Sequence, residues 1–294
     1  MLLAALHPIH EEAAVPDPVA RTYPQGVTCW VDLETPDATA VVDFYSGLLG
    51  WRLEDAMPPA LPGHYLIASL RGEDAAAIAS GAASIGTEAA WNTYIAVDEV
   101  ETIVAAVERA GGRVVAGPTD TPGGRTAVCA DPQDAPFRLW QAGRRVGAQV
   151  ANEPGAWNFS DLRTTDGAAA ARFYGEVFGW RVADLGPDAG GFIQVPGYGE
   201  HLAASADPQI FERQRAVGTP DGFADAIGAI QPAAPGEAAH WHVTFTVADR
   251  EAALEAVRSG GGRVDSLRET MWAQAADVRD PAGAAFSVSR FTRG

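Results

Sequence analysis

The sequence has few cysteines, no long apolar run and no excess of basic residues, and each absence excludes a class of protein. Cys29 and Cys129 are the only cysteines among the 294 residues. Two cysteines cannot form a disulfide framework, and their spacing is not that of a metal site. No stretch approaches the roughly 18 uncharged apolar residues that a membrane-spanning helix needs. The net charge of -17 excludes the basic surface on which nucleic-acid binding depends.

The N-terminal segment indicates a cytoplasmic protein with an irregular leader. Leu2–Leu6 is apolar, but no basic residue precedes it and Glu11 follows soon after, so it lacks the features of a signal peptide. Residues 1–25 are rich in proline and show no sustained periodicity. We interpret them as an N-terminal arm.

The chain contains an internal duplication. Three landmarks return in the same order: Phe44–Trp51 (FYSGLLGW) as Phe173–Trp180 (FYGEVFGW), Val97–Val114 as Val247–Val264, and the Asp-Pro pair at Asp131 as that at Asp280. Repeats of this kind indicate two homologous units. We place the first domain at residues 26–145 and the second at 154–293, with an inserted loop at about 207–239.

Each domain is itself doubled. Val27–Glu34 alternates apolar and polar residues, which predicts a strand. Asp37 is a suitable N-cap for the following helix, which stops at Gly50. Trp91–Val97 and then Val100–Ala110 repeat this strand and helix, and about three short strands follow each helix. The pattern predicts an α+β protein.

The second domain repeats the order with a longer middle section. A strand at Ala156–Arg163 leads to a helix that begins at Asp166. We predict further strands at Phe192–Val195 and His201–Ala204, and the composition of Ile210–Ala216 favours a short helix. The inserted loop is expected either to cover a pocket or to form a solvent loop.

These landmarks together resemble the vicinal oxygen chelate superfamily of glyoxalases, bleomycin-resistance proteins and extradiol dioxygenases, in its tandem two-domain form. The resemblance covers about residues 26–293. It implies two tandem domains, each a pair of βαβββ modules whose mixed sheet curls into a cup-shaped half-barrel. It is less specific for activity, because one scaffold hosts many chemistries.

The resemblance also implies where a metal ion would be held. Metal-dependent members place ligands on the first, fifth and eighth strands of a domain, as a set of two histidines and one carboxylate. These positions fall on Trp30, Asn92 and Arg138 in the first domain and on Phe159, His242 and Ser287 in the second. Only His242 binds metals readily, so we expect neither a metal nor another cofactor. A register slip of two residues would bring Asp32, Asp161 or His240 to the same faces and restore a metal site.

Strand alternation groups the residues of acid–base chemistry in the second domain. Asp161 and Arg163 share one face of the first strand, and His240 and His242 share one face of the fifth. An imidazole moves protons near neutral pH and a carboxylate fixes its tautomer, so we interpret these four residues as a catalytic set. The alternative is structural: His240 caps a loop, His242 forms a hydrogen bond inside the barrel, and Asp161 pairs with Arg163.

The equivalent face of the first domain has aromatic walls and few proton carriers. It carries Trp30, Asp32, Glu34, Asn92, Tyr94 and Arg138. Such a face suits a planar organic molecule, and the alternative for Trp30 is a place in the core. Phe159, Trp272 and Ser287 are candidate substrate contacts in the second domain.

Three functional hypotheses follow. The first is a metal-independent isomerase, lyase or hydrolase that acts on a small aromatic or polyketide-like metabolite. The second is a non-catalytic drug-binding protein, which the missing metal ligands and an acidic charge attractive to a cationic drug favour. The third is a metal-dependent glyoxalase or dioxygenase. The partner is a small molecule in each case, and tandem domains are compatible with a monomer or a homodimer.

Overall fold

The first half of the chain forms one eight-stranded sheet with two α-helices. The computed structural model describes residues 20–81, 88–184, 191–270 and 272–292. The elements of this half are β1 (Thr28–Glu34), the 3-10 turn η1 (Thr39–Val41), α1 (Val42–Leu49), β2 (Arg52–Asp55), β3 (Gly63–Leu70), β4 (Glu73–Gly81), β5 (Ala90–Ala96), α2 (Val100–Arg109), β6 (Arg113–Asp120), β7 (Gly124–Ala130) and β8 (Pro136–Ala142). The strand order is β2-β3-β4-β1-β5-β8-β7-β6. Because β1 is parallel to β4 and antiparallel to β5, the sheet is mixed.

The second half repeats this arrangement and adds helices. Its elements are β9 (Trp157–Thr164), α3 (Gly167–Phe178), β10 (Arg181–Asp184), β11 (Gly191–Gln194), α4 (Tyr198–Ala203), α5 (Ile210–Val217), the 3-10 turn η2 (Phe223–Asp225), β12 (Ala226–Pro232), β13 (His240–Thr246), α6 (Arg250–Ser259), β14 (Arg263–Glu269), β15 (Ala273–Arg279) and β16 (Ala285–Phe291). The order β10-β11-β12-β9-β13-β16-β15-β14 matches the first sheet strand by strand. The predicted α+β fold of two tandem domains is therefore confirmed. No helix within the described ranges is long and apolar enough to cross a membrane.

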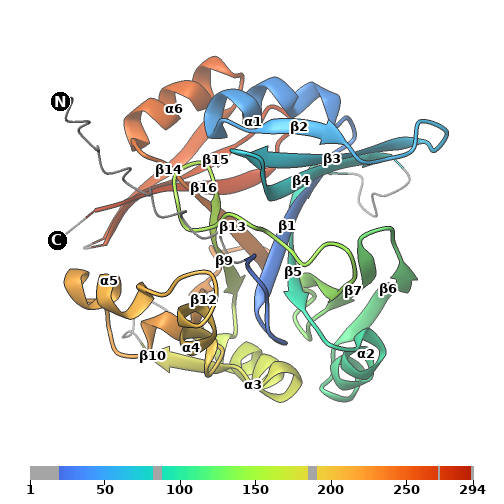
Figure 1. The fold of residues 1–294 in the computed structure, drawn as a ribbon, viewed down its shortest axis with the longest axis vertical. Helices are drawn as coiled ribbons and strands as arrows, with labels where there is room; N and C mark the ends of the chain where they lie inside the picture. The colour runs from blue at the N-terminus through green and yellow to red at the C-terminus, as the bar shows by residue number, and fades with distance from the viewer. Residues whose placement is uncertain (1–19, 82–87, 185–190, 271, 293–294) are drawn as a thin grey trace, which may run out of the picture.

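The helices of the two domains pack against one another in alternate pairs. α1 lies against α6 and α2 lies against α3, at the top and the bottom of the view in Figure 1. Both main hydrophobic clusters contain residues of both domains: Val31 packs in the same cluster as Phe245, and Phe137 in the same cluster as Phe173. The first module of each domain is thus joined to the last module of the other.

The Phe-Tyr and Asp-Pro motifs form this domain interface. The Tyr45 hydroxyl donates a hydrogen bond to the Asp280 carboxylate (3.0 Å), and the Tyr174 hydroxyl donates one to Asp131 (3.3 Å). In both copies a tryptophan on the domain's fifth strand donates to the tyrosine hydroxyl. Buried polar groups need such partners. The motifs that reveal the duplication therefore join the domains and do not line the cups.

The Gly-Gly-Arg motifs follow α2 and α6 where the opposite domain comes close. A Cβ on Gly112 would lie 3.0 Å from the Phe173 ring, and a Cβ on Gly262 would lie 2.9 Å from the Phe44 ring. Neither distance leaves room for a side chain. The phenylalanine of one domain thus fills the space that the glycine of the other leaves open.

One local prediction in the second domain is wrong. His201–Ala204 was expected to form a strand, but His201 lies in α4, where Tyr198 and Leu202 are both buried four residues apart on one helical face. The strand at this place in the sheet is β12, which lies inside the stretch expected to be an inserted loop. α4, α5 and η2 thus stand between β11 and β12, where the first domain has only a tight turn between β3 and β4.

Candidate functional site

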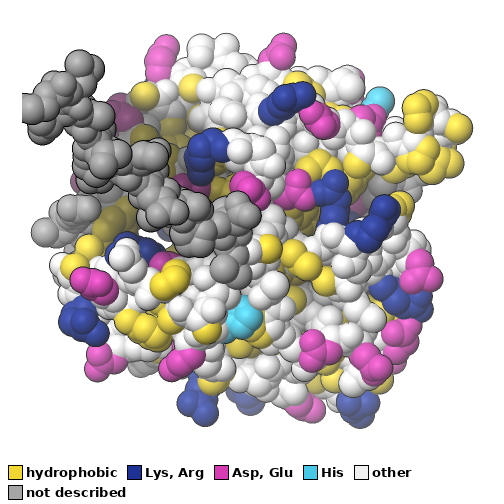
Figure 2. All heavy atoms as spheres, viewed as in Figure 1, with side chains coloured by type: hydrophobic (Ala, Val, Ile, Leu, Met, Phe, Trp, Pro, Cys, Tyr) yellow, Lys and Arg dark blue, Asp and Glu magenta, His cyan; other side chains and the backbone are white. Residues whose placement is uncertain are grey.

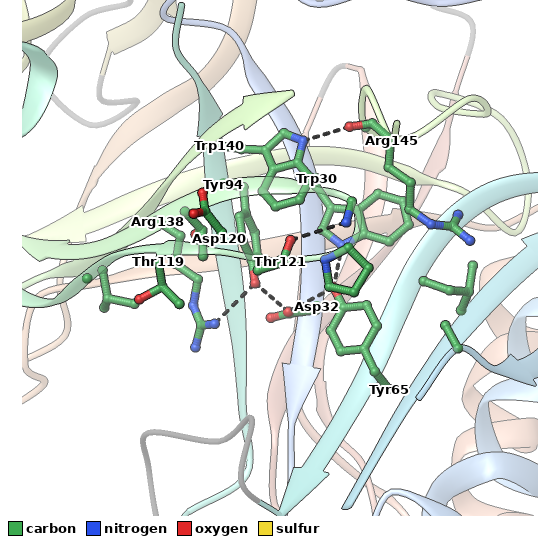
Figure 3. A pocket seen from close by; sticks show the side chains of 18 of the residues that line it. Trp30, Asp32, Tyr65, Tyr94, Thr119, Asp120, Thr121, Arg138, Trp140 and Arg145 are labelled. Atoms are coloured by element: carbon green, nitrogen blue, oxygen red, sulfur yellow. Dashed lines mark hydrogen bonds between the residues drawn. The ribbon is translucent and has the colours of Figure 1, made fainter. Parts of the chain in front are cut away.

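The first domain holds a cavity of about 510 Å³. Its inner wall combines aromatic rings with one carboxylate, from Trp30, Asp32, Tyr65, Tyr94 and Trp140. Figure 3 shows these side chains converging from β1, β3, β5 and β8. A cavity of this size with apolar walls and a few polar groups is typical of small-molecule sites.

The Asp32 carboxylate forms the centre of a hydrogen-bond network at the base of the cavity. Its side chain is 1% exposed. It accepts hydrogen bonds from the hydroxyls of Tyr94 (2.5 Å) and Tyr65 (3.3 Å) and from the amide of Asn92 (2.9 Å). The Trp30 indole N–H donates in turn to the Tyr65 hydroxyl (3.1 Å). A buried carboxylate is tolerated only with such partners, and they fix its position.

Arg138 is the cationic end of this network. Its Nη1 donates to the Tyr94 hydroxyl (3.1 Å), and its Nη2 pairs with the buried Glu34 carboxylate. Burial alone lowers the pKa of Arg138, but the Tyr94 hydroxyl and the nearby carboxylates outweigh it and raise that pKa. Burial and the Asp32 charge raise the pKa of Tyr94 and of Tyr65. Both phenols therefore stay protonated at neutral pH and remain donors.

Two loops and the connector between the domains form the mouth of the cavity. The loops contribute Met57 and Leu61 from the β2–β3 loop and Asp120 and Thr121 from the end of β6 and its turn. Figure 2 shows hydrophobic side chains at the projecting tip of the β2–β3 hairpin. In the connector, the Arg145 carbonyl accepts the Trp140 indole N–H (3.0 Å), and the Arg145 guanidinium pairs with Asp74. The connector thus holds Trp140 at the entrance.

The second domain has a different polar cluster, centred on Asp277 of β15. Its carboxylate accepts hydrogen bonds from Ser287 (2.6 Å), Arg163 (2.9 Å) and Arg268 (3.1 Å). The His242 Nε2 lies 2.9 Å from the Ser287 hydroxyl and 3.5 Å from the Asp277 carboxylate. Five strands of the sheet, β9 and β13 to β16, meet in this cluster.

Burial sets the protonation states of this second cluster. It lowers the pKa of His242 to about 4, despite the nearby Asp277 carboxylate, so the imidazole is neutral at neutral pH and its contact with Asp277 is not an ion pair. Burial raises the pKa of Asp277, but hydrogen bonds from His242 and Ser287 and the two arginine charges hold it well below its usual range. Burial also raises the pKa of Asp161 to about 6, although its Oδ1 accepts the Ala229 N–H (2.8 Å).

Comparison with known proteins places this arrangement in a family. The model of the Glyoxalase/Bleomycin resistance protein/Dioxygenase superfamily matches residues 30–139 and 157–288. The chain belongs to this superfamily. It is 34% identical over 276 residues to the putative glyoxylase CFP32 of Mycobacterium tuberculosis, covering 92% of this chain and 97% of that protein. It is also 34% identical over 285 residues to the anthracycline biosynthesis protein DnrV of Streptomyces peucetius, covering 92% and 94%.

Solved structures of the superfamily share the fold. The Mn(II)-bound glyoxalase of Novosphingobium aromaticivorans matches with a TM-score of 0.58 at 16% identity, over 90% of this chain and 82% of that chain. The 2,3-dioxygenase LapB of Pseudomonas sp. KL28 matches with a TM-score of 0.58 at 13% identity, over 90% and 93%. At these identities the likeness extends to the fold alone. The superfamily assignment supports small-molecule binding in a glyoxalase-like fold.

The donor atoms of this superfamily member do not fit a metal ion at the expected ligand positions. In the first domain the Trp30 indole and the Arg138 guanidinium have no free electron pair to offer a cation. In the second domain Phe159 and Ser287 accompany His242, and a single imidazole is a poor site by itself. Among the described residues, no three His, Cys, Asp or Glu side chains are grouped to hold a metal.

Four residues predicted as substrate contacts line the cavity of the first domain: Trp30, Asp32, Tyr94 and Arg138. Asn92, also predicted, does not line the cavity but donates a hydrogen bond to Asp32, which does. Strand alternation grouped Trp30 with Asp32 and Asn92 with Tyr94, because residues two apart on one strand share a face. The position of Arg138 came from the resemblance to the superfamily.

Of the residues predicted in the second domain, Arg163, His242 and Ser287 meet at Asp277, and the ring centroids of His240 and His242 are 5.8 Å apart. Phe159 packs edge-on against Phe223 of the inserted segment, with ring centroids 6.3 Å apart. The His240 Nδ1 contacts the backbone carbonyl of Ala238 (3.0 Å), which agrees with its structural alternative. Trp272 lies in the β14–β15 turn. The catalytic assignment of His242, His240, Asp161 and Arg163 stays a prediction.

Tyr65, Asp277 and Arg268 are among the residues at the two sites that were not predicted. Tyr65 follows a histidine on β3, and no alternation in that strand indicates which of the two faces inward. Arg268 lies on β14 and Asp277 on β15, and the small and charged residues of these strands mark no apolar face. For these residues the pairing of the strands, rather than the sequence pattern, determines the orientation.

Proposed function

We propose that the protein binds a planar aromatic metabolite of polyketide type in the cavity of the first domain. The observation that supports this is the group of rings from Trp30, Tyr65 and Trp140 around one cavity of about 510 Å³ with a polar base (Figure 3). Aromatic side chains bury large flat surfaces and favour offset stacking or edge-to-face contact with other rings. A flat fused-ring molecule makes the best use of such walls.

The names of relatives agree with this class of ligand. Two are anthracycline biosynthesis proteins, DnrV of Streptomyces peucetius and DauV of Streptomyces sp. strain C5, each 34% identical to this chain. Anthracyclines are planar, fused-ring polyketides. A cavity walled by aromatic residues is a chemical match for such a molecule.

The base of the cavity supports acid–base chemistry that needs no metal. The Asp32 carboxylate lies where it can accept a proton from a ligand carbon or hydroxyl. Tyr65 and Tyr94 stay protonated and donate to Asp32, and once Asp32 takes up a proton, either hydroxyl can turn to a ligand carbonyl oxygen on which negative charge develops. A proton shift beside a carbonyl, as in an isomerase or a lyase, is the reaction that these groups favour. The set predicted around His242 in the second domain is the alternative location for this chemistry.

Non-catalytic binding is the second candidate function. Asp32 already accepts three hydrogen bonds from protein groups. A ligand can therefore fill the cavity without exchanging a proton with this carboxylate. A protein that sequesters an aromatic drug needs no more than the walls of the cavity.

Calorimetric titration with dihydroxyanthraquinone, a planar fused-ring probe, tests the binding site. Trp30→Ala is expected to weaken binding about tenfold through the loss of one ring contact and its apolar area. Trp272→Ala is the matched control, because this tryptophan does not line the cavity, and it should bind as the wild type does. Equal affinity of wild type and Trp30→Ala would refute the assignment of the site.

The Asp32→Asn variant separates catalysis from sequestration. The ligand for this test is a fused-ring ketone with a C–H beside its carbonyl, because dihydroxyanthraquinone has none. After incubation in deuterated water, it is recovered and its carbon-bound deuterium is analysed by mass spectrometry and NMR. Conversion or proton exchange by the wild type, and its loss in Asp32→Asn with binding retained, supports acid–base chemistry. Ligand recovered unchanged from both proteins supports sequestration. Unchanged activity in Asp32→Asn would move the chemistry away from Asp32.

A further inference from the structure

We propose that the ligand of the first domain carries an oxyanion substituent, such as a carboxylate, sulfonate or phosphate, which binds in a second, polar compartment beside the aromatic cavity. This inference rests on the proposed function and specifies the ligand further. The inference is based on the shape and the charge of a space beside the mouth of the aromatic cavity. A ligand that contacts only the aromatic walls leaves this space empty.

The second compartment has a volume of about 420 Å³ and is continuous with the aromatic cavity. Asp74, Arg145 and Gly147 line both spaces, and Arg144 and Gln149 line the second alone. The wall is held in place because the Gln149 side chain hydrogen-bonds to the backbone of the N-terminal segment. A ligand seated on the aromatic rings can therefore extend a substituent into this compartment without leaving the protein.

The charge of the compartment favours an anion. Arg145 pairs with Asp74, but no carboxylate among the described residues pairs with Arg144. The Nε of Arg144 donates to the Pro122 carbonyl (2.9 Å), and this bond fixes the plane of the guanidinium. The two Nη groups take no part in it and can bind a ligand. A guanidinium fork binds carboxylate and phosphate oxygens through two parallel hydrogen bonds.

Arg144 and Arg145, which line the compartment, are both exposed. Figure 2 shows dark blue basic groups between the β2–β3 hairpin and the β6–β7 strands. This local positive charge contrasts with the net charge of -17 of the whole chain. An anionic ligand thus gains attraction here against the repulsion of the protein as a whole.

The other end of the site disfavours an anion. Asp32 lies at the base of the aromatic cavity, and Asp120, which pairs with Arg125, lies at its rim. The cation beneath them, Arg138, is already bonded to Glu34 and Tyr94. An oxyanion is therefore directed away from the base and toward Arg144, which fixes the orientation of the ring system over Asp32.

Calorimetric titration of the full chain with three probes tests the inference. The probes are neutral dihydroxyanthraquinone and its carboxylate and sulfonate derivatives. The anionic probes are expected to bind about fivefold more tightly than the neutral probe, the gain of a well-oriented but exposed ion pair, and added salt should reduce this preference. Comparison of the two derivatives shows which oxyanion the compartment prefers.

The Arg144→Gln variant should lose the preference and keep the wild-type affinity for the neutral probe. Arg172→Gln, on α3, removes the same charge from an exposed residue that lines neither compartment, and it should keep the preference. If the neutral probe binds and the anionic probes bind no more tightly, or if both variants lose the preference equally, the inference is wrong and the proposed function stands. If none of the three probes binds, the proposed function itself fails.

Discussion

Replacing Asp161 by asparagine is expected to stabilise the protein at neutral pH. Burial raises the pKa of this carboxyl from 3.8 to about 6. The folded state thus holds the proton more tightly than the unfolded state, so the carboxyl stabilises the fold below about pH 4 and this contribution is lost as the pH rises through about 6. Each pKa unit corresponds to about 1.36 kcal/mol. The ionised carboxylate therefore costs up to about 3 kcal/mol at neutral pH, and solvent around this partly exposed side chain reduces the cost to about 2 kcal/mol.

Asparagine removes the charge and keeps the contact. Its side-chain oxygen can still accept the Ala229 N–H, which is 2.8 Å from Oδ1 of Asp161. His242 titrates in the same range with the opposite sign: its lowered pKa of about 4 means that it stabilises the fold above about pH 6.5 and loses this contribution as the pH falls. Because His242 is present in both proteins, the difference in stability between them reports on Asp161.

Urea denaturation followed by tryptophan fluorescence, at several pH values between about 4 and 7.5, measures this difference. The variant should be about 2 kcal/mol more stable near neutral pH, and the gain should vanish toward pH 4. Asp166→Asn is the control, because exposed Asp166 also accepts a backbone N–H, from Ala169 (2.8 Å), and it should give no such gain. A pH-independent loss of stability in Asp161→Asn would refute the reasoning.

Further predictions concern the domain interface and the base of the cavity. Tyr45→Phe and Tyr174→Phe should each lower the free energy of unfolding by about 1–3 kcal/mol, because a buried carboxylate loses a donor; urea denaturation checks both. Arg138→Met should cost about 3–5 kcal/mol, because the buried Glu34 carboxylate loses the charge of Arg138 beside it, and adding Glu34→Leu should restore part of this loss. Gly228→Ala should lower the melting temperature sharply, because its Cβ would lie 2.1 Å from a β9 carbonyl oxygen; calorimetry checks this.

The fold was predictable because its determinants are local and repeated. Alternation in Val27–Glu34 matches β1, and the glycine stop at Gly50 adopts the left-handed conformation (φ 72°) that ends α1. The middle of the second domain was not predictable in the same way. β12 (AIGAIQP) contains glycine and proline, follows three short helical segments and has no alternation of its own. Its place in the sheet comes from pairing with β11 and β9.

The candidate site was only partly predictable, for a related reason. Alternation gives the face of a strand, so Trp30, Asp32 and Tyr94 could be grouped before their contacts were known. It does not give the partners across the cup. Tyr65 and Arg145 reach the cavity from a hairpin and from the connector between the domains, and their positions depend on tertiary packing.

The two domains show how one frame supports two different sites. In the first domain, Asp32 lies opposite Asn92 and Tyr94 lies opposite Arg138. At the same places in the second domain, Asp161 lies opposite His242 and Thr244 lies opposite Ser287. The backbone positions are therefore equivalent, while the side chains differ in size, charge and proton affinity. In the first domain they border an aromatic cavity, and in the second they join the cluster around Asp277, with residues of the inserted segment packed on the same sheet.

The contacts between the domains have changed far less than the cups. Each tyrosine of a Phe-Tyr motif still bonds to the aspartate of the opposite Asp-Pro motif, and each Gly-Gly-Arg motif still packs on the opposite phenylalanine. A change in a cup alters one site, whereas a change in this interface disturbs the packing of both domains at once. The chemistry of this protein is accordingly to be sought where its two halves differ, beginning with the cavity around Asp32 and the polar compartment at Arg144.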